Sequence, residues 1–135
     1  MIRFGDVRFR YANSTFELGV PSLEIPPGQR VAIIGPSGSG KTTLLHLMAG
    51  IRAVTAGEVH MGNYAVHSMS DSDRRRFRAK HVGLVFQEFE LLDYLNVVEN
   101  ILLPYRLHSA LSLTPPVRQR AQELAHALGL EDKLR

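Results

Sequence analysis

The feature of this chain that most constrains its fold is a glycine-rich run between an apolar segment and a helix-forming one. The run reads Gly35-Pro36-Ser37-Gly38-Ser39-Gly40-Lys41-Thr42 and matches the pattern G-x-x-x-x-G-K-[ST] in full. Residues 31–34 before it are apolar and mostly β-branched, which predicts a buried strand of a parallel sheet. Residues 41–49 after it are good helix formers, and Gly50 provides a stop. Strand, glycine-rich loop and helix in this order predict an α/β fold.

A loop of this kind binds phosphate groups. Its glycines allow the backbone to turn back, so that successive N–H groups and the helix N-terminus form a nest for phosphate oxygens. The Lys41 ammonium would reach the β- and γ-phosphates of a nucleoside triphosphate. The Thr42 hydroxyl would bind Mg²⁺, which prefers hard oxygen ligands. A chance Gly/Ser turn is the alternative, but the flanking strand and helix favour a nucleotide site.

Composition excludes several other classes of protein. The chain has 135 residues, which is typical of one domain, and its 44% hydrophobic and 21% charged residues are typical of globular proteins. It has no cysteine, which excludes disulfide scaffolds, thiolate metal sites and a cysteine nucleophile. The net charge of +3 is too small to indicate nucleic-acid binding. With only short apolar runs and no signal-peptide core, we expect a cytosolic, soluble protein.

Three further segments have the pattern of strands. Residues 2–11 alternate between apolar and polar side chains, but the alternation changes phase at Gly5-Asp6, which predicts two short strands or one bulged strand. Residues 58–61 form a short strand candidate that a Gly62-Asn63 turn closes. Residues 82–86 are apolar throughout, so we expect them to form a second buried strand of the parallel sheet.

Three further segments have helix signals. Ser70 would cap a helix that runs to about Ala79. Asn96 with Glu99 resembles a capping box, and Pro104 should end that helix near Leu103. The last helix opens at Thr114-Pro115-Pro116 and ends at Gly129. Its expected apolar stripe consists of Val117, Ala121, Leu124 and Leu128.

The chain resembles the nucleotide-binding subunit of an ATP-binding-cassette (ABC) transporter. The resemblance is carried by spaced pieces whose order and spacing hold across nearly the whole chain: Tyr11, 23–28, 35–45, 48–50, 55–59, 82–87 and 96–101. Within that family, the stretch 81–103 is most similar to bacterial export ATPases of the lipoprotein-releasing and macrolide-efflux type. The resemblance implies a P-loop NTPase fold with an antiparallel β portion at the N-terminus.

The resemblance also implies roles for individual residues. Tyr11 would stack on adenine, although an aromatic side chain at a strand end is also typical of a core. Residues Gly35 to Thr43 would hold the phosphates. Gln87 matches the glutamine that would bind Mg²⁺ beside Thr42 and touch the attacking water, which makes it the candidate catalytic residue. A glutamine at a strand end is otherwise a solvated cap.

The same resemblance predicts the organisation of the chain and its partners. Residues 1–87 would form an ATP-binding core, and residues 88–135 the start of a helical subdomain. The apolar residues between 89 and 95 are either a docking surface for a membrane permease subunit or core of that subdomain. A second nucleotide-binding subunit is the other implied partner, and the permease would hold the protein at the inner face of the cell membrane.

A basic cluster leaves three interpretations open. It consists of Arg74, Arg75, Arg76, Arg78 and Lys80. A solvated helix face, contact with a partner subunit or lipid headgroups, and nucleic-acid binding would each suit it, but few aromatic residues interleave it as nucleic acid would require.

Several of the family's catalytic elements have no counterpart in this sequence. It contains no Ser-Gly-Gly signature loop and no strand that ends in Asp-Glu. We therefore expect an incomplete domain that lacks the C-terminal catalytic part, either because the chain is truncated or because the rest lies on another chain. A nucleotide-binding remnant without turnover remains an alternative to an active transporter ATPase, and so does a different P-loop enzyme such as a small-molecule kinase.

Overall fold

The computed structural model describes residues 1–87 and 91–130. The chain divides into two compact units, Met1–Arg78 and Ala79–Arg135. Glu88, where we expected the helical subdomain to begin, and Phe89 of the expected docking surface lie outside the described residues.

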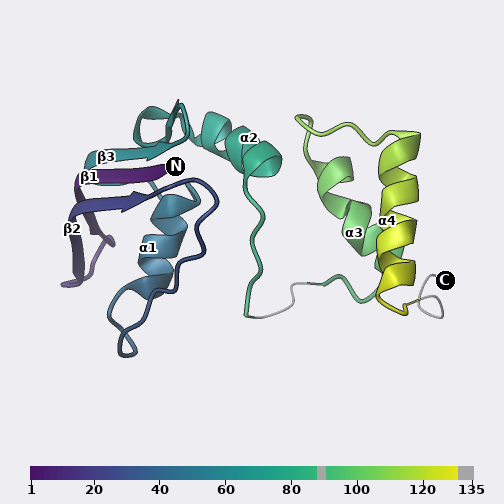
Figure 1. The fold of residues 1–135 in the computed structure, drawn as a ribbon, viewed down its shortest axis with the longest axis horizontal. Coiled ribbons are helices and arrows are strands. Elements are labelled where there is room, and N and C mark those ends of the chain that lie inside the picture. Colours follow the sequence, from purple (N-terminus) through teal and green to yellow (C-terminus); the bar gives the residue numbers. More distant parts are fainter. Residues whose placement is uncertain (88–90, 131–135) are drawn as a thin grey trace. The chain divides into compact units, whose positions relative to one another are not determined.

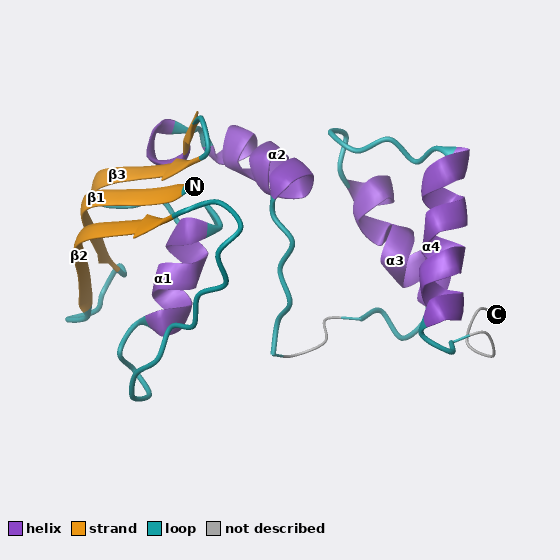
Figure 2. Ribbon diagram, viewed as in Figure 1, coloured by secondary structure: helices purple, strands orange, loops and turns teal. Residues whose placement is uncertain are grey.

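The first unit is built around a four-stranded antiparallel sheet with the strand order β2-β1-β3-β4. Its strands are β1 (Ile2–Arg10), β2 (Glu17–Ile25), β3 (Ala56–Met61) and the short β4 (Tyr64–Ala65). β1 lies in the centre and pairs with β2 on one side and β3 on the other (Figures 1 and 2). The expected antiparallel portion at the N-terminus is confirmed.

The phase change in β1 is a bulge within one strand. The register against β3 shifts between Gly5 and Arg8, and Asp6 has a φ of 47°. The bulge lets side chains three and then two residues apart face the core: Phe4, Val7 and Phe9. Opposite the bulge, Gly57 has a φ of 85°, and a Cβ there would lie 2.3 Å from the Asp6 carbonyl oxygen. Only glycine fits this close approach of the two strands.

Helix α1 (Lys41–Met48) lies beside the sheet and supplies the other half of the core. Leu47 and Met48 at its C-terminal end are buried, as is Val59 of β3. The helix ends as predicted, because Gly50 has a φ of 66° that few other residues adopt. Packing on the sheet therefore fixes the helix that follows the glycine-rich loop.

Helix α2 (Asp71–His81) follows the 3₁₀ turn Val66–Ser68 and contains the basic cluster. Ser70 caps it as predicted, since its Oγ accepts the Asp73 backbone N–H at 3.1 Å. Arg78 donates to the Gly50 carbonyl oxygen at 2.7 Å, and burial lowers the pKa of Arg78. Arg74, Arg75 and Arg76 form ion pairs with the two acidic residues of the first turn, Asp71 and Asp73. Most arginines of the basic cluster thus stabilise α2 itself or hold the segment that follows α1.

The two predicted parallel strands are wrong. Residues 31–34 and 82–86 are not strands, and their side chains are largely exposed, with Ile34 and Val85 91% and 94% exposed. A strand exists through backbone hydrogen bonds to a neighbour, and the described sheet places no strand beside either segment. The strand prediction for both segments rested on their apolar side chains, and the structure does not bury these side chains.

In the described part of the second unit, helices α3 (Val97–Leu107) and α4 (Pro115–Ala127) contact each other (Figure 1). The capping box is confirmed, because the Asn96 side chain accepts the Glu99 N–H and the Glu99 side chain accepts the Asn96 N–H. The predicted stop at Leu103 is wrong, and α3 continues through Pro104. The His108 N–H donates to the Pro104 carbonyl at 3.0 Å, and burial of Leu102 against its neighbours outweighs the local preference of the residue before proline.

Asn100 holds the segment before α3 in place. Its Oδ1 accepts the Leu92 N–H at 2.9 Å, and its Nδ2 donates to the carbonyls of Leu92, Leu95 and Asn96. In α4 the buried side chains are Ala121 and Ala125, whereas Leu128 of the predicted stripe is 71% exposed. Gly129, with a φ of 67°, ends α4 as predicted. Within the described residues no helix is long and apolar enough to cross a membrane.

We expect the chain to self-associate in dilute buffer, because Ile34 and Val85 present apolar surface to water. Replacing both by asparagine should shift the mass measured by analytical ultracentrifugation towards the monomer. The control Gln122→Asn exchanges one exposed neutral amide side chain for another and should leave the association unchanged. A clean wild-type monomer with a sharp cooperative thermal melt would contradict this expectation.

Candidate functional site

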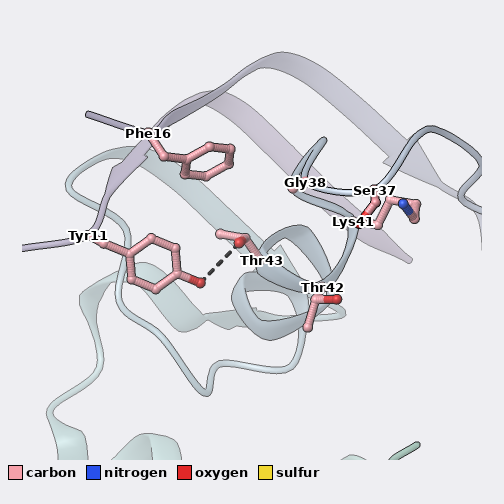
Figure 3. Close-up of a pocket in the computed structure, with 8 residues that line it drawn as sticks. Tyr11, Phe16, Ser37, Gly38, Lys41, Thr42 and Thr43 are labelled. Atoms are coloured by element: carbon pink, nitrogen blue, oxygen red, sulfur yellow. Dashed lines mark hydrogen bonds between the residues drawn. The ribbon is translucent and has the colours of Figure 1, made fainter. Parts of the chain in front are cut away.

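The glycine-rich loop, the start of α1 and the segment between β1 and β2 enclose one pocket of about 340 Å³ (Figure 3). All of it lies in the first unit. Its lining consists of Tyr11, Phe16, Ser37, Gly38, Gly40, Lys41, Thr42 and Thr43. The volume falls in the range typical of small-ligand sites. The structure thus brings together most of the residues that the motif singled out, and adds Phe16.

The loop turns back on itself through two glycines. Gly38 and Gly40 have φ values of 79° and 93°, and the Ser39 N–H donates to the Pro36 carbonyl at 3.3 Å. A Cβ on Gly40 would lie 2.9 Å from Cζ of Phe16, so the pocket wall also requires glycine here. Left-handed residues of this kind allow a loop to form an anion nest of backbone N–H groups.

Helix α1 begins in this pocket without a side-chain cap. Gly40 is its N-cap residue and makes no capping hydrogen bond through a side chain. The first N–H groups of an α-helix have no partner within the helix, and the helix dipole adds partial positive charge at this end. The pocket floor is therefore a set of N–H donors, an arrangement suited to phosphate oxygens.

Lys41 lies over the loop that carries it. Its Nζ donates to the carbonyl oxygens of Gly35 at 2.9 Å and Pro36 at 2.7 Å. These acceptors are neutral, whereas a phosphate oxygen would be a charged acceptor and form a stronger hydrogen bond. The ammonium is thus held beside the pocket by contacts that a phosphate can replace.

The two threonines of the loop have different surroundings. Thr42 is exposed and lines the pocket, so its hydroxyl is free to be a metal ligand. Within residues 1–87 and 91–130, no group of three or more acidic or histidine side chains could hold a metal ion. A single hydroxyl fits Mg²⁺, which is usually held by few protein ligands together with substrate phosphates and water. Thr43 is buried, and its Oγ1 lies 3.0 Å from the Tyr11 hydroxyl.

Tyr11 is half-buried at the pocket wall. It packs edge-on against Phe9, with ring centroids 4.8 Å apart, and lies 6.2 Å from Phe16 at a tilt of 41°. The guanidinium carbon of Arg52 lies 5.1 Å from the centroid of the Tyr11 ring. Tyr11 therefore lines the pocket while it also contacts the core, and its stacking on adenine stays a prediction.

Phe16 and Arg52 were missed by reasoning from the sequence. Phe16 lies just before β2, and the hairpin between β1 and β2 brings it back towards Tyr11. Arg52 follows α1 and meets Tyr11 from a part of the chain 41 positions away. The second aromatic residue within a short hairpin loop was an available signal, but nothing in the sequence indicated Arg52.

Gln87 belongs to the second unit, and it is exposed at a bend. It does not follow a strand, because residues 82–86 do not form one. Its role as a magnesium ligand and catalytic residue stays a prediction. Glu88, the carboxylate that follows it in the sequence, lies outside the described residues.

The comparison with protein families finds a match to the ABC transporter model over residues 18–135. The chain is 40% identical over 123 residues to the lipoprotein-releasing system ATP-binding protein LolD of Psychrobacter arcticus, covering 91% of the chain and 54% of LolD. It is 41% identical over 112 residues to the ABC transporter ATP-binding protein YbbA of Escherichia coli K12, covering 83% of the chain and 48% of YbbA. The chain thus spans about half the length of the curated relatives it matches.

A solved structure gives the same result for the fold. The dimeric ATP-binding cassette MJ0796, in a post-hydrolysis state bound to ADP and Pi, superposes with a TM-score of 0.80 at 30% identity. The match covers 99% of this chain and 60% of that one. The mixed α/β fold with its antiparallel sheet is that of the ABC cassette, a P-loop NTPase. The chain belongs to the ABC transporter family, among its ATP-binding proteins.

Proposed function

We propose that this chain binds Mg·ATP in the pocket between the glycine-rich loop and Tyr11, as part of an ATP-binding subunit that drives an ABC transporter. One observation carries the proposal: a single unit holds an uncapped helix N-terminus, two left-handed glycines, a lysine and an aromatic ring around one cavity. Family membership supports ATP as the nucleotide.

The triphosphate would lie along the loop. Backbone N–H groups around Gly38 and Gly40 would donate to the phosphate oxygens, and Lys41 would move from the loop carbonyls to the β- and γ-phosphates. Thr42 would be the ligand of this unit to Mg²⁺, and the ion would neutralise charge on the phosphates. The adenine ring would stack on Tyr11, with Phe16 close by.

The transport role rests on the relatives. LolD is named as the ATP-binding protein of a lipoprotein-releasing system, and MJ0796 is described as a dimer. By this analogy, the chain would act with a membrane permease subunit and a second nucleotide-binding subunit at the cytoplasmic face of the membrane. Gln87 would serve as magnesium ligand and contact the attacking water once the site is complete. Export of the lipoprotein-releasing type is the form that we propose.

Replacing Lys41 by alanine should weaken ATP binding. The substitution removes a charge-assisted contact of about 1.5–3 kcal/mol, which corresponds to roughly 10- to 150-fold in affinity. Isothermal titration calorimetry with Mg·ATP tests this against Lys80→Ala, which removes the same charge from α2 and should bind as the wild type does. Equal affinities of Lys41→Ala and wild type would reject the site.

Binding of the adenine base of ATP should depend on the Tyr11 ring. Tyr11→Ala removes the stacking surface and should weaken ATP by about 0.5–1.5 kcal/mol. Tyr11→Phe keeps the ring and loses only the hydrogen bond to Thr43, so its loss should be smaller. Calorimetry with ATP and with inorganic tripolyphosphate separates base from phosphate binding. If both variants bind ATP like the wild type, Tyr11 is a core residue only.

The 135-residue chain by itself should show no significant ATP turnover. It supplies phosphate donors, Lys41, Thr42 and Gln87, but its sequence contains no carboxylate at a position that matches the family's base. Loss of one preorganised charge-stabilising group typically lowers a rate by about 10²–10³, and losses of this kind need not multiply. Phosphate release at saturating Mg·ATP is the measurement.

The control for this prediction is Glu88→Gln. Glu88 follows Gln87 in the sequence, so it is the carboxylate to test as a candidate catalytic base. Robust phosphate release in the wild type that disappears in Glu88→Gln, as well as in Lys41→Ala, would show that this sequence contains its own base and would overturn the prediction.

A further inference from the structure

Arg52 contacts the wall of the pocket, although neither the motif nor the family pattern singled it out. Its guanidinium carbon lies 5.1 Å from the centroid of the Tyr11 ring, within the range of a cation–π interaction. Its backbone is fixed to α1, since the N–H groups of Ile51 and Arg52 both donate to the His46 carbonyl, at 2.9 and 3.3 Å. Arg52 therefore approaches Tyr11 from a well-anchored position beyond the end of the helix.

The other contacts of Tyr11 do not fix the direction in which the face of its ring points. The hydroxyl is held by Thr43 Oγ1 at 3.0 Å, and the ring stands at 86° to the Phe9 ring. A hydrogen bond at the hydroxyl end restrains the position of the ring but permits rotation about the bond between the ring and Cβ. A planar cation over one face restrains that rotation, because guanidinium groups stack on aromatic faces.

We propose that Arg52 is a positioning residue of the base subsite: its guanidinium orients the Tyr11 ring so that the ring presents a flat face to adenine. This inference rests on the proposed function, in which Tyr11 stacks on the base. Arg52 acts through Tyr11 and touches no phosphate in this assignment. Its effect is therefore confined to ligands that carry a base.

This role predicts that replacing Arg52 changes the affinity for ATP, which has a base, and leaves the affinity for phosphate groups alone unchanged. An exposed cation–π contact corresponds to about a two- to fivefold change in an equilibrium constant. Arg52→Ala should lower ATP affinity by that factor because an unrestrained ring must be ordered when the base binds. Affinity for inorganic tripolyphosphate, which has no base, should be unchanged. Lysine keeps the cation without the planar guanidinium, so Arg52→Lys should recover part of the ATP affinity.

The experiment is calorimetry on the 135-residue chain with Mg²⁺ and either ATP or tripolyphosphate. The proteins are wild type, Arg52→Ala, Arg52→Lys and Arg3→Ala, which removes the same charge from an exposed position on β1. We expect the weakest ATP binding in Arg52→Ala, an intermediate affinity in Arg52→Lys, wild-type affinity in Arg3→Ala, and tripolyphosphate affinities that agree throughout. A thermal melt of each variant checks that the first unit remains folded.

A double-mutant cycle with Tyr11→Leu tests whether Arg52 acts through the ring. Once Tyr11 is replaced, Arg52→Ala should have no further effect on ATP affinity. The inference is overturned if Arg52→Ala binds ATP like the wild type, if it weakens ATP and tripolyphosphate equally, as a loss of general charge would do, or if it binds ATP more tightly, as a group that competes with the base would do.

Failure of the proposed function would look different. If the wild type does not bind ATP, or if Tyr11→Leu binds it as tightly as the wild type, the base subsite itself is wrong and the role of Arg52 falls with it. If Tyr11→Leu weakens ATP and Arg52→Ala does not, the proposed function stands and only the role of Arg52 is rejected.

Discussion

A hydrogen bond between the Tyr11 hydroxyl and Thr43 Oγ1 connects the two halves of the candidate site. Tyr11 directly follows β1, and Thr43 lies in the first turn of α1, 32 positions later. Thr43 is the one buried polar side chain among the described residues, so its hydroxyl needs a partner inside the protein. This bond places an aromatic ring beside the glycine-rich loop, and the pocket exists because both sides are held at once.

The remaining geometry of the pocket follows from backbone freedom at a few glycines. Gly57 allows β3 to approach the bulge of β1, which directs Phe4, Val7 and Phe9 into the core under α1. Gly40 has no side chain to collide with the ring of Phe16, so the loop can pass it. Gly40 itself adopts a left-handed conformation as the N-cap residue of α1. A side chain at either position would collide with its neighbour, so the sheet and the loop share one kind of constraint.

Local patterns predicted the elements that depend on local interactions. The Ser70 cap, the Asn96–Glu99 capping box and the glycine stop of α4 involve residues within a few positions of each other. The errors concern interactions with distant parts of the chain. Residues 31–34 and 82–86 were expected as strands, but a strand needs a neighbour that the described sheet does not offer. Pro104 lies inside α3 because tertiary packing outweighs a preference of the residue before it.

The sequence by itself determined the place and the local form of the candidate phosphate site, because the loop Gly35 to Thr42 and its helix are contiguous and their conformation depends on glycine and on helix geometry. The resemblance to ABC proteins added the candidate roles of Tyr11 and Gln87. Only the tertiary structure decided what surrounds Tyr11. Phe16 returns to it through the hairpin, and Arg52 reaches it from beyond α1. The contact of Arg52 depends on how the sheet and the helix pack, and no spacing in the sequence specifies that packing.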